Sequence, residues 1–282
     1  MKRSTRAELA RQTVEIVERG SYRSSTGCHV DIAEAVRTCL DATRLYTPEE
    51  LERFRQEILS RPAEPTPVAF EVVNETTLCG IARVWSGARG PVAALNFASA
   101  KNPGGGFLNG SHAQEESLAR SSALHASLIR AWGFYERHRA SPSLLYSDAM
   151  VLSPNCPVIR DDEGRLLDEP QRVTFITSAA PNAGAIAEKR PAEMASIPEV
   201  LRRRSEYVLA LAASQGYKQL VLGAWGCGVF RNDPGAVASA FADHLRHGAW
   251  SRRFERVVFS VLDASASGET FDAFARAFGP AG

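Results

Sequence analysis

After residue 67, short β-branched runs alternate with longer helical stretches, and this alternation most constrains the fold. Strands and helices that alternate in this way form a mainly parallel sheet with helices on both faces. The predicted strands are Val68–Val73, Val92–Phe97, Ala149–Ser153, Val173–Ser178, Leu220–Ala224 and Val257–Leu262. The predicted helices are Thr77–Trp85, Gln114–Arg139, Ala192–Ser214, Gly235–Arg246 and Glu269–Phe278. The chain is therefore expected to have an α/β fold, with ligands bound where the strands end.

The N-terminal part, residues 1–62, lacks this alternation and is predicted to be a helical extension of a domain at residues 63–282. Its predicted helices are about Arg6–Arg19, Asp31–Thr43 and a third that begins at Thr47. The third start is favoured because a capping Thr is followed by Pro in the first turn and then by acidic residues. Three prolines within Arg61–Pro67 predict a linker to the following domain.

Composition narrows the classes of partner. The chain carries 33 basic and 32 acidic residues, so no global basic field favours duplex nucleic acid. No apolar run approaches the roughly 20 residues that span a bilayer, so no membrane partner is expected. Five scattered cysteines without a Cys-x-x-Cys pair fit a reducing compartment and argue against a structural zinc site. The charged start of the chain is no secretory signal, and we expect a cytoplasmic protein.

One glycine-rich segment, Asn102–Glu116, combines two kinds of chemistry. It contains Gly104, Gly105 and Gly106, and then Gln114, Glu115 and Glu116 at the predicted start of a helix. Consecutive glycines let a bulky group lie against the backbone amides, which suits phosphates, whereas carboxylates suit glycosidic chemistry. Together they indicate a substrate with a pyrophosphate and a scissile ribose bond. The alternative is a flexible loop whose glutamates only complement the helix dipole.

The two glutamates are expected to have different tasks. Adjacent residues on a helix point about 100° apart, so Glu115 and Glu116 cannot act on the same atom. One carboxylate would hold a substrate hydroxyl, and the other would face the reacting bond.

A second glycine-rich segment follows the predicted strand Leu220–Ala224 and leads into a helix. Its candidate binding residues are Gly226, Cys227, Gly228, Val229 and Phe230. The amides of a Gly-x-Gly turn near a helix start can form an anion-binding nest, although a tight strand-to-helix turn would also need glycines. Cys227 is expected to be a small spacer, because no histidine lies at a local spacing that would activate it as a nucleophile.

The triple glycine followed by Gln-Glu-Glu resembles the signature of poly(ADP-ribose) glycohydrolases, and the N-terminal helices resemble the extension of the bacterial-type members. The resemblance covers about residues 68 to 265. It implies a macrodomain-like, three-layer mixed sheet flanked by helices. It also implies cleavage of ribose–ribose O-glycosidic bonds in poly(ADP-ribose), with ADP-ribose as the product and without a metal or other cofactor.

The same resemblance implies roles for individual residues. Glu116 would be the catalytic acid/base, Glu115 would anchor the ribose hydroxyls, and Gln114 would support the loop. Phe230 would pack against the terminal ribose beside the second phosphate-binding loop. Glu75 would accept a hydrogen bond from the adenine amino group, although a helix cap within residues 74–77 is an equal alternative.

Three points stay open in the sequence. Members of this branch carry an asparagine shortly before the glycines, and here either Ser99 or Asn102 takes its role toward the distal ribose. Asn182 either contacts the substrate or forms a turn. A hydrolase of mono-ADP-ribosylated protein or of other ADP-ribose derivatives is the closer alternative function. A non-catalytic reader of ADP-ribose would leave both glutamates idle.

Overall fold

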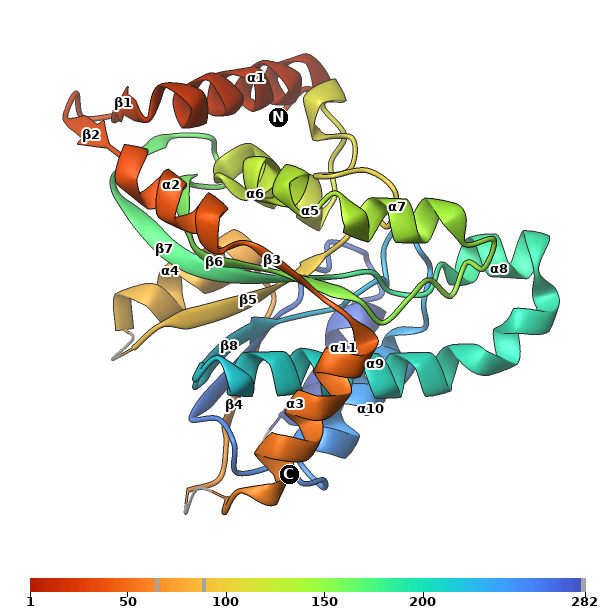
Figure 1. The fold of residues 1–282 in the computed structure, drawn as a ribbon. Coiled ribbons are helices and arrows are strands. Elements are labelled where there is room, and N and C mark those ends of the chain that lie inside the picture. The colour runs from red at the N-terminus through yellow and green to blue at the C-terminus, as the bar shows by residue number, and fades with distance from the viewer. Residues whose placement is uncertain (64–65, 88–89, 280–282) are drawn as a thin grey trace.

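A seven-stranded mixed sheet forms the centre of the computed structural model, which describes residues 1–63, 66–87 and 90–279 (Figure 1). The strand order is β3-β6-β7-β5-β8-β9-β4. Strands β7, β5, β8, β9 and β4 run parallel, whereas β6 and β3 are antiparallel to their neighbours. The strands are β3 (Arg44–Tyr46), β4 (Ala69–Val73), β5 (Val92–Phe97), β6 (Met150–Arg160), β7 (Leu166–Ser178), β8 (Gln219–Leu222) and β9 (Arg256–Ser260).

Helices cover both faces of this sheet, and successive residues of its strands enter two separate hydrophobic clusters. Ala93 and Leu95 of β5 pack on one side, and Val92 and Ala94 pack on the other. The first side is covered by α3 (Pro48–Ser60), α9 (Ile197–Ser214), α10 (Pro234–Leu245) and α11 (Glu269–Phe278). The second side holds α1 (Arg3–Arg19), α2 (Ala33–Ala42), α4 (Thr77–Gly87), α5 (Gln114–Ser121), α6 (Leu124–Arg130) and α7 (Gly133–Ala140). The predicted three-layer α/β fold is confirmed.

Two predicted helices were wrong in their extent. The stretch Gln114–Arg139 is three helices, and the first break arises because Ser122 is extended and its backbone pairs with Val158 of β6. The stretch Ala192–Ser214 is divided into η2 (Pro191–Ser196) and α9. Pro198 lies in the first turn of α9, where its missing N–H costs nothing.

The N-terminal part contains the three predicted helices together with strands that were not predicted. Strands β1 (Ser21–Arg23) and β2 (His29–Asp31) pair with each other, and β3 pairs with β6 at the sheet edge. Thr47 and Glu50 form the capping box that starts α3. A division at residue 62 stays a prediction. In the predicted linker Arg61–Pro67, residues 64 and 65 lie outside the described residues.

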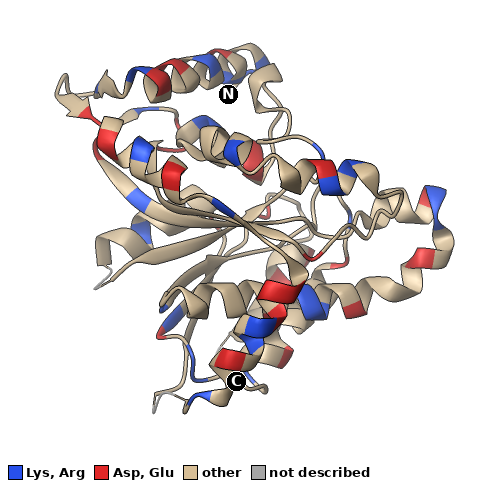
Figure 2. Cartoon of the chain, in the orientation of Figure 1, with Lys and Arg blue, Asp and Glu red and all other residues tan. Residues whose placement is uncertain are grey.

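The parallel strands bring five loops to one edge of the sheet, because their carboxyl ends point the same way. These loops follow β4, β5, β7, β8 and β9. Acidic and basic residues are interspersed along the helices (Figure 2). Within the described ranges, no helix has the length and apolarity that crossing a membrane requires. The remaining elements are η1 (Phe107–Asn109) and α8 (Ala183–Lys189).

Candidate active site

A cavity of about 900 Å³ lies at the edge of the sheet where the parallel strands end. Its walls come from the loops after β4, β5, β8 and β9 and from the first turn of α5. Most of the predicted site residues line it: Glu75, Ser99, Asn102, Gly105, Gly106, Gln114, Glu115, Glu116, Gly226, Cys227, Gly228, Val229 and Phe230. The fold therefore joins the two glycine-rich segments, which are more than a hundred residues apart, in one cleft.

Two predicted binding residues do not line the cavity that the described residues form. Gly104 has φ +67°, and a Cβ atom there would meet Phe107 and Ala119, so this glycine serves the turn. Asn182 caps α8, because its Oδ1 accepts the N–H of Ala185 at 3.1 Å. Of the two alternatives for Asn182, the structure favours the turn.

Glu115 lies in the first turn of α5 and is buried, with 2% of its surface exposed. Its Oε1 accepts a hydrogen bond from Nδ2 of Asn96 at 3.1 Å, and its Oε2 accepts the N–H of Ser99 at 2.7 Å. Burial raises the pKa of this carboxyl to about 8, although both hydrogen bonds oppose the shift. Glu115 is therefore mainly protonated at neutral pH.

This raised pKa predicts a pH dependence of stability. The folded state holds the Glu115 proton up to about pH 8, whereas an unperturbed carboxyl releases it near 4.5. The contribution of Glu115 to folding is thus fully present below about pH 4.5 and is lost as the pH rises toward 8. Glu115→Gln should flatten the decline in unfolding free energy across this window, as measured by urea denaturation at several pH values. An unchanged pH profile in this variant would contradict the assignment.

Glu116 faces the triple glycine instead of the sheet. Its Oε1 accepts the N–H of Gly106 at 3.1 Å, and a Cβ atom at Gly105 would clash with that oxygen. Its Oε2 has no hydrogen-bond partner among the described residues, and the side chain lines the cavity. The two adjacent carboxyls thus have different surroundings. Both oxygens of Glu115 accept hydrogen bonds from the protein, whereas only one oxygen of Glu116 does so among the described residues.

Gln114 ties the start of α5 to β5. Its Nε2 donates to the carbonyl of Leu95 at 2.8 Å and to Oγ1 of Thr77 at 3.2 Å. Its Oε1 accepts the N–H of Phe97 at 2.9 Å. These contacts fix the helix turn that carries both glutamates, which is a supporting role.

The side chain of Asn232 stabilises the conformation of the second glycine-rich loop. Gly226 has φ +76°, and a Cβ atom there would lie 2.5 Å from Cβ of Ala180 and 2.6 Å from Nδ2 of Asn232. That Nδ2 donates to the carbonyls of Pro181 and Gly226. At Gly228, by contrast, a Cβ atom would have no neighbour within 4 Å, so this backbone borders open space.

Cys227 is partly buried in the same loop. Burial raises the pKa of its thiol to about 12, so the thiolate that a nucleophile requires does not form at neutral pH. This agrees with the expectation that Cys227 is a spacer.

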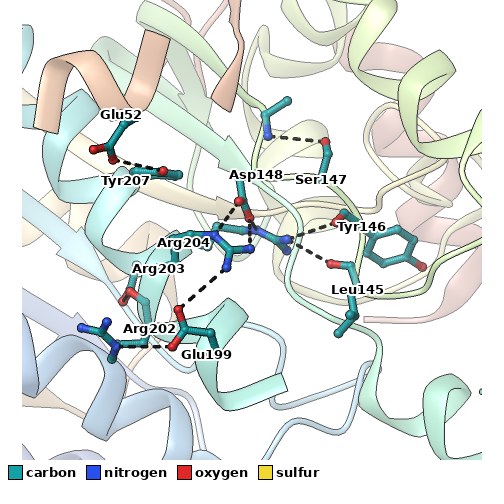
Figure 3. A network of polar contacts seen from close by, with 12 residues as sticks. Glu52, Leu145, Tyr146, Ser147, Asp148, Glu199, Arg202, Arg203, Arg204 and Tyr207 are labelled. Carbon is teal, nitrogen blue, oxygen red and sulfur yellow. Dashed lines mark hydrogen bonds and ion pairs between the residues drawn. The ribbon is translucent and has the colours of Figure 1, made fainter. Parts of the chain in front are cut away.

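Phe230 lines the cavity and is backed by a turn that a buried arginine holds in place. Its ring centroid lies 6.1 Å from that of Tyr146, a residue with φ +61°. The side chain of Arg204 is fully buried and donates to the carbonyls of Leu145 and Tyr146, with Asp148 as its counter-ion at 2.9 Å (Figure 3). Arg204 therefore fixes the backbone of Tyr146 behind Phe230.

The resemblance implies poly(ADP-ribose) as the substrate and contact of the Phe230 ring with the terminal ribose, so we expect Phe230→Ala to lower the turnover of the polymer more than the affinity for ADP-ribose. Loss of the ring would let the ribose shift, and a misplacement of about 1 Å can cost roughly 100-fold in rate. Steady-state kinetics together with calorimetric titration of ADP-ribose would check this. Unchanged turnover with weakened binding would mean that Phe230 is only a binding surface.

In the segment after β4, a helix cap is present, and the adenine contact of Glu75 stays a prediction. Glu75 lines the cavity, and its Oε1 accepts hydrogen bonds from Oγ of Ser260 at 3.0 Å and from Nη2 of Arg83 at 2.7 Å. Thr76 supplies the cap, because its Oγ1 accepts the N–H of Cys79 at 3.1 Å. Glu75 is thus held in place by protein donors at the cavity wall.

The two candidates for the distal-ribose role lie side by side in the loop after β5. Oγ of Ser99 accepts the N–H of Asn102 at 3.3 Å, and Oδ1 of Asn102 accepts a hydrogen bond from Arg139 at 3.3 Å. Both residues line the cavity, but only Ser99 is linked directly to Glu115.

Asn96 is a site residue that the sequence reasoning missed. It is fully buried at the end of β5, and its Nδ2 donates to Glu115 and to Oγ1 of Thr177. Its Oδ1 has no partner among the described residues. The available signal was a polar residue within the apolar strand Val92–Phe97. Across the described part of the chain, no group of three or more His, Cys, Asp or Glu side chains is placed to hold a metal ion.

Comparison with known proteins gives matches across nearly the whole chain. Residues 10–161 match the family described as "Microbial-type PARG, catalytic domain", where PARG is poly(ADP-ribose) glycohydrolase. The crystal structure of this glycohydrolase from Thermomonospora curvata is 49% identical, with a TM-score of 0.93, over 98% of this chain and 100% of that chain. A second structure of the T. curvata enzyme, bound to the inhibitor ADP-HPD, is 48% identical, with a TM-score of 0.90, over 97% and 99%.

A structure of the enzyme from Deinococcus radiodurans in complex with ADP-ribose is more distant. It is 44% identical to this chain, with a TM-score of 0.81, over 88% of this chain and 98% of that chain. A search of curated proteins gave no match.

Proposed function

Since the chain belongs to the microbial-type poly(ADP-ribose) glycohydrolases, it is a glycoside hydrolase of poly(ADP-ribose), and we propose how its cleft performs this hydrolysis. One observation carries the proposal: two adjacent carboxyls with different surroundings face one cavity beside the triple glycine. This arrangement separates the holding of the ribose from the transfer of the proton.

In the proposed mechanism, Glu116 is the general acid and then the general base. A ribose O-glycosidic bond breaks through an oxocarbenium-like state when the leaving oxygen is protonated and water attacks the anomeric carbon. Glu116 gives its proton to the leaving ribose oxygen and then takes a proton from the attacking water. The support is its position: Gly106 holds one oxygen, and the other has no partner among the described residues.

Glu115 has the positioning role in this proposal. Asn96 and Ser99 hold its carboxyl rigidly, and its raised pKa leaves a proton on it at neutral pH. A neutral carboxyl can both donate a hydrogen bond to a ribose hydroxyl and accept one from it. Either Ser99 or Asn102 would contact the distal ribose.

The rest of the ligand is assigned to the remaining walls of the cavity. We propose that the diphosphate lies against the backbone of Gly105 and Gly106 and is bound by amides of the loop from Gly226 to Phe230. Glu75 would accept a hydrogen bond from the adenine amino group. A macrodomain-like identity of the fold and a cytoplasmic location belong to the same proposal, and the location rests on the scattered cysteines.

The experiment that tests this function compares two substrates. Incubation with poly(ADP-ribose) should release free ADP-ribose, detected by chromatography, and Glu116→Gln should release far less. Mono-ADP-ribosylated protein, given at the same concentration, should be cleaved more slowly. Faster release from the mono-ADP-ribosylated protein would favour the alternative hydrolase. Binding of ADP-ribose without any release from the polymer would favour a reader.

A further inference from the structure

An exposed tryptophan lies beside the catalytic cleft, where α6 passes into α7. The side chain of Trp132 is 41% exposed, and the guanidinium carbon of Arg139 lies 4.7 Å from its ring centroid. Nη2 of Arg139 also donates to Oδ1 of Asn102, which lines the cavity. Asn102 therefore connects the cavity rim to this surface pair, which we call the Trp132–Arg139 pair.

Exposed basic residues outnumber acidic ones around this pair, where Glu136 is the acidic residue of α7. Lys101 precedes Asn102 in the same loop, and Arg130 lies two residues before Trp132; both are exposed, as is Arg139. None of these three cations has a carboxylate partner within the described ranges. An exposed aromatic ring among cations that have no carboxylate partner is a combination that can bind a nucleobase together with its phosphate.

The position of the pair indicates which part of the substrate would reach it. The loop that contains Asn102 also supplies the amides that bind both glutamates, from Ser99 to Glu115 and from Gly106 to Glu116. The scissile bond therefore lies against this loop. In poly(ADP-ribose) the leaving oxygen is a ribose hydroxyl of the next unit's adenosine, so an adenine and a phosphate emerge next to the cleaved bond.

We propose that the Trp132–Arg139 pair is a subsite for the adenosine phosphate of the unit that remains on the polymer. The adenine stacks on the exposed part of the Trp132 ring, and Arg139 binds the phosphate while it stays linked to Asn102. The inference rests on the proposed function, because it uses the direction in which a polymer leaves the cleft.

Trp132→Ala in the full chain tests the proposal. Stacking of a base on an aromatic ring typically corresponds to about 5- to 150-fold in affinity, so KM for long poly(ADP-ribose) should rise by a factor in that range. The kcat should stay within about twofold, and calorimetric affinity for free ADP-ribose should not change, because the product occupies only the cleft. Trp132→Phe should retain most of the parent KM.

Two controls separate a subsite from a structural effect. An aryl glycoside of ADP-ribose has no adenosine in its leaving group, so Trp132→Ala should hydrolyse it with the parent KM. Met194→Ala removes another hydrophobic side chain of 41% exposure, in η2, and should leave both substrates unaffected.

The outcomes distinguish a failure of the proposed subsite from a failure of the proposed function. An unchanged polymer KM in Trp132→Ala, or an equal change with the aryl glycoside, would overturn the subsite while hydrolysis by the parent protein stands. Failure of the parent protein to release ADP-ribose from either substrate would instead overturn the proposed function. Arg139→Ala should also raise the polymer KM and reduce its dependence on salt concentration.

Discussion

Replacing Glu116 with glutamine is expected to lower the rate of poly(ADP-ribose) hydrolysis by about 10²–10⁴-fold, the usual contribution of general acid–base catalysis. Glutamine keeps the size of the side chain, and its carbonyl oxygen can still accept the N–H of Gly106. It cannot transfer the proton. ADP-ribose should therefore bind within a few-fold of the parent affinity, as calorimetric titration would show.

Glu115→Gln is the matched comparison, because it changes the neighbouring carboxyl. The new amide can be accommodated: its N–H₂ can face Oδ1 of Asn96, which lacks a partner among the described residues, after that side chain flips. This variant should weaken ADP-ribose binding as well as rate, because the proposed partner of Glu115 is a ribose hydroxyl in the ground state. A Glu116→Gln enzyme that hydrolyses polymer at the parent rate would show that the acid/base assignment is wrong.

Gly105→Val is expected to abolish both hydrolysis and ADP-ribose binding in a protein that still folds. Gly105 has φ +58°, which a β-branched residue adopts only with strain. Its Cβ atom would clash with Oε1 of Glu116 and lie 2.9 Å from Cδ of the same side chain. The added methyl groups would also occupy the space where the diphosphate is proposed to lie against the backbone of this loop.

Gly216→Val is the control for the backbone strain alone. Gly216 has a similar positive φ of +80°, but a Cβ atom there has no neighbour within 4 Å, and the residue lies in the turn between α9 and β8. In both variants the free energy of unfolding should fall by about 1–2 kcal/mol, because a residue with a Cβ atom is strained in the left-handed conformation. Only Gly105→Val should fail in calorimetry, where the parent protein binds one ADP-ribose per chain. Normal binding by Gly105→Val would mean that the triple glycine serves the turn alone.

Local patterns explain which parts of the fold could be predicted. Strand β5 was predicted with its observed ends, because an apolar run bounded by polar and glycine residues is a local signal. The capped start of α3 is equally local, since Thr47 and Glu50 satisfy each other's backbone groups. The prediction of one long helix from Gln114 was wrong for the opposite reason. Ser122 interrupts that helix by pairing with Val158, 36 residues later, and a contact at this sequence distance leaves no signal in the local helical periodicity.

For the site, the sequence alone identified the segments that line the cavity: the triple glycine, the Gln-Glu-Glu run and the second glycine loop, because phosphate and glycosidic chemistry favour these residue types in short segments. Only the tertiary structure decided how their side chains are arranged and what surrounds them. The burial of Glu115 that raises its pKa, the contact from Asn96, and the support of Phe230 by Arg204 depend on residues from distant segments. A pKa and an orientation are set by everything that surrounds a group, and those surroundings exist only once the sheet has formed.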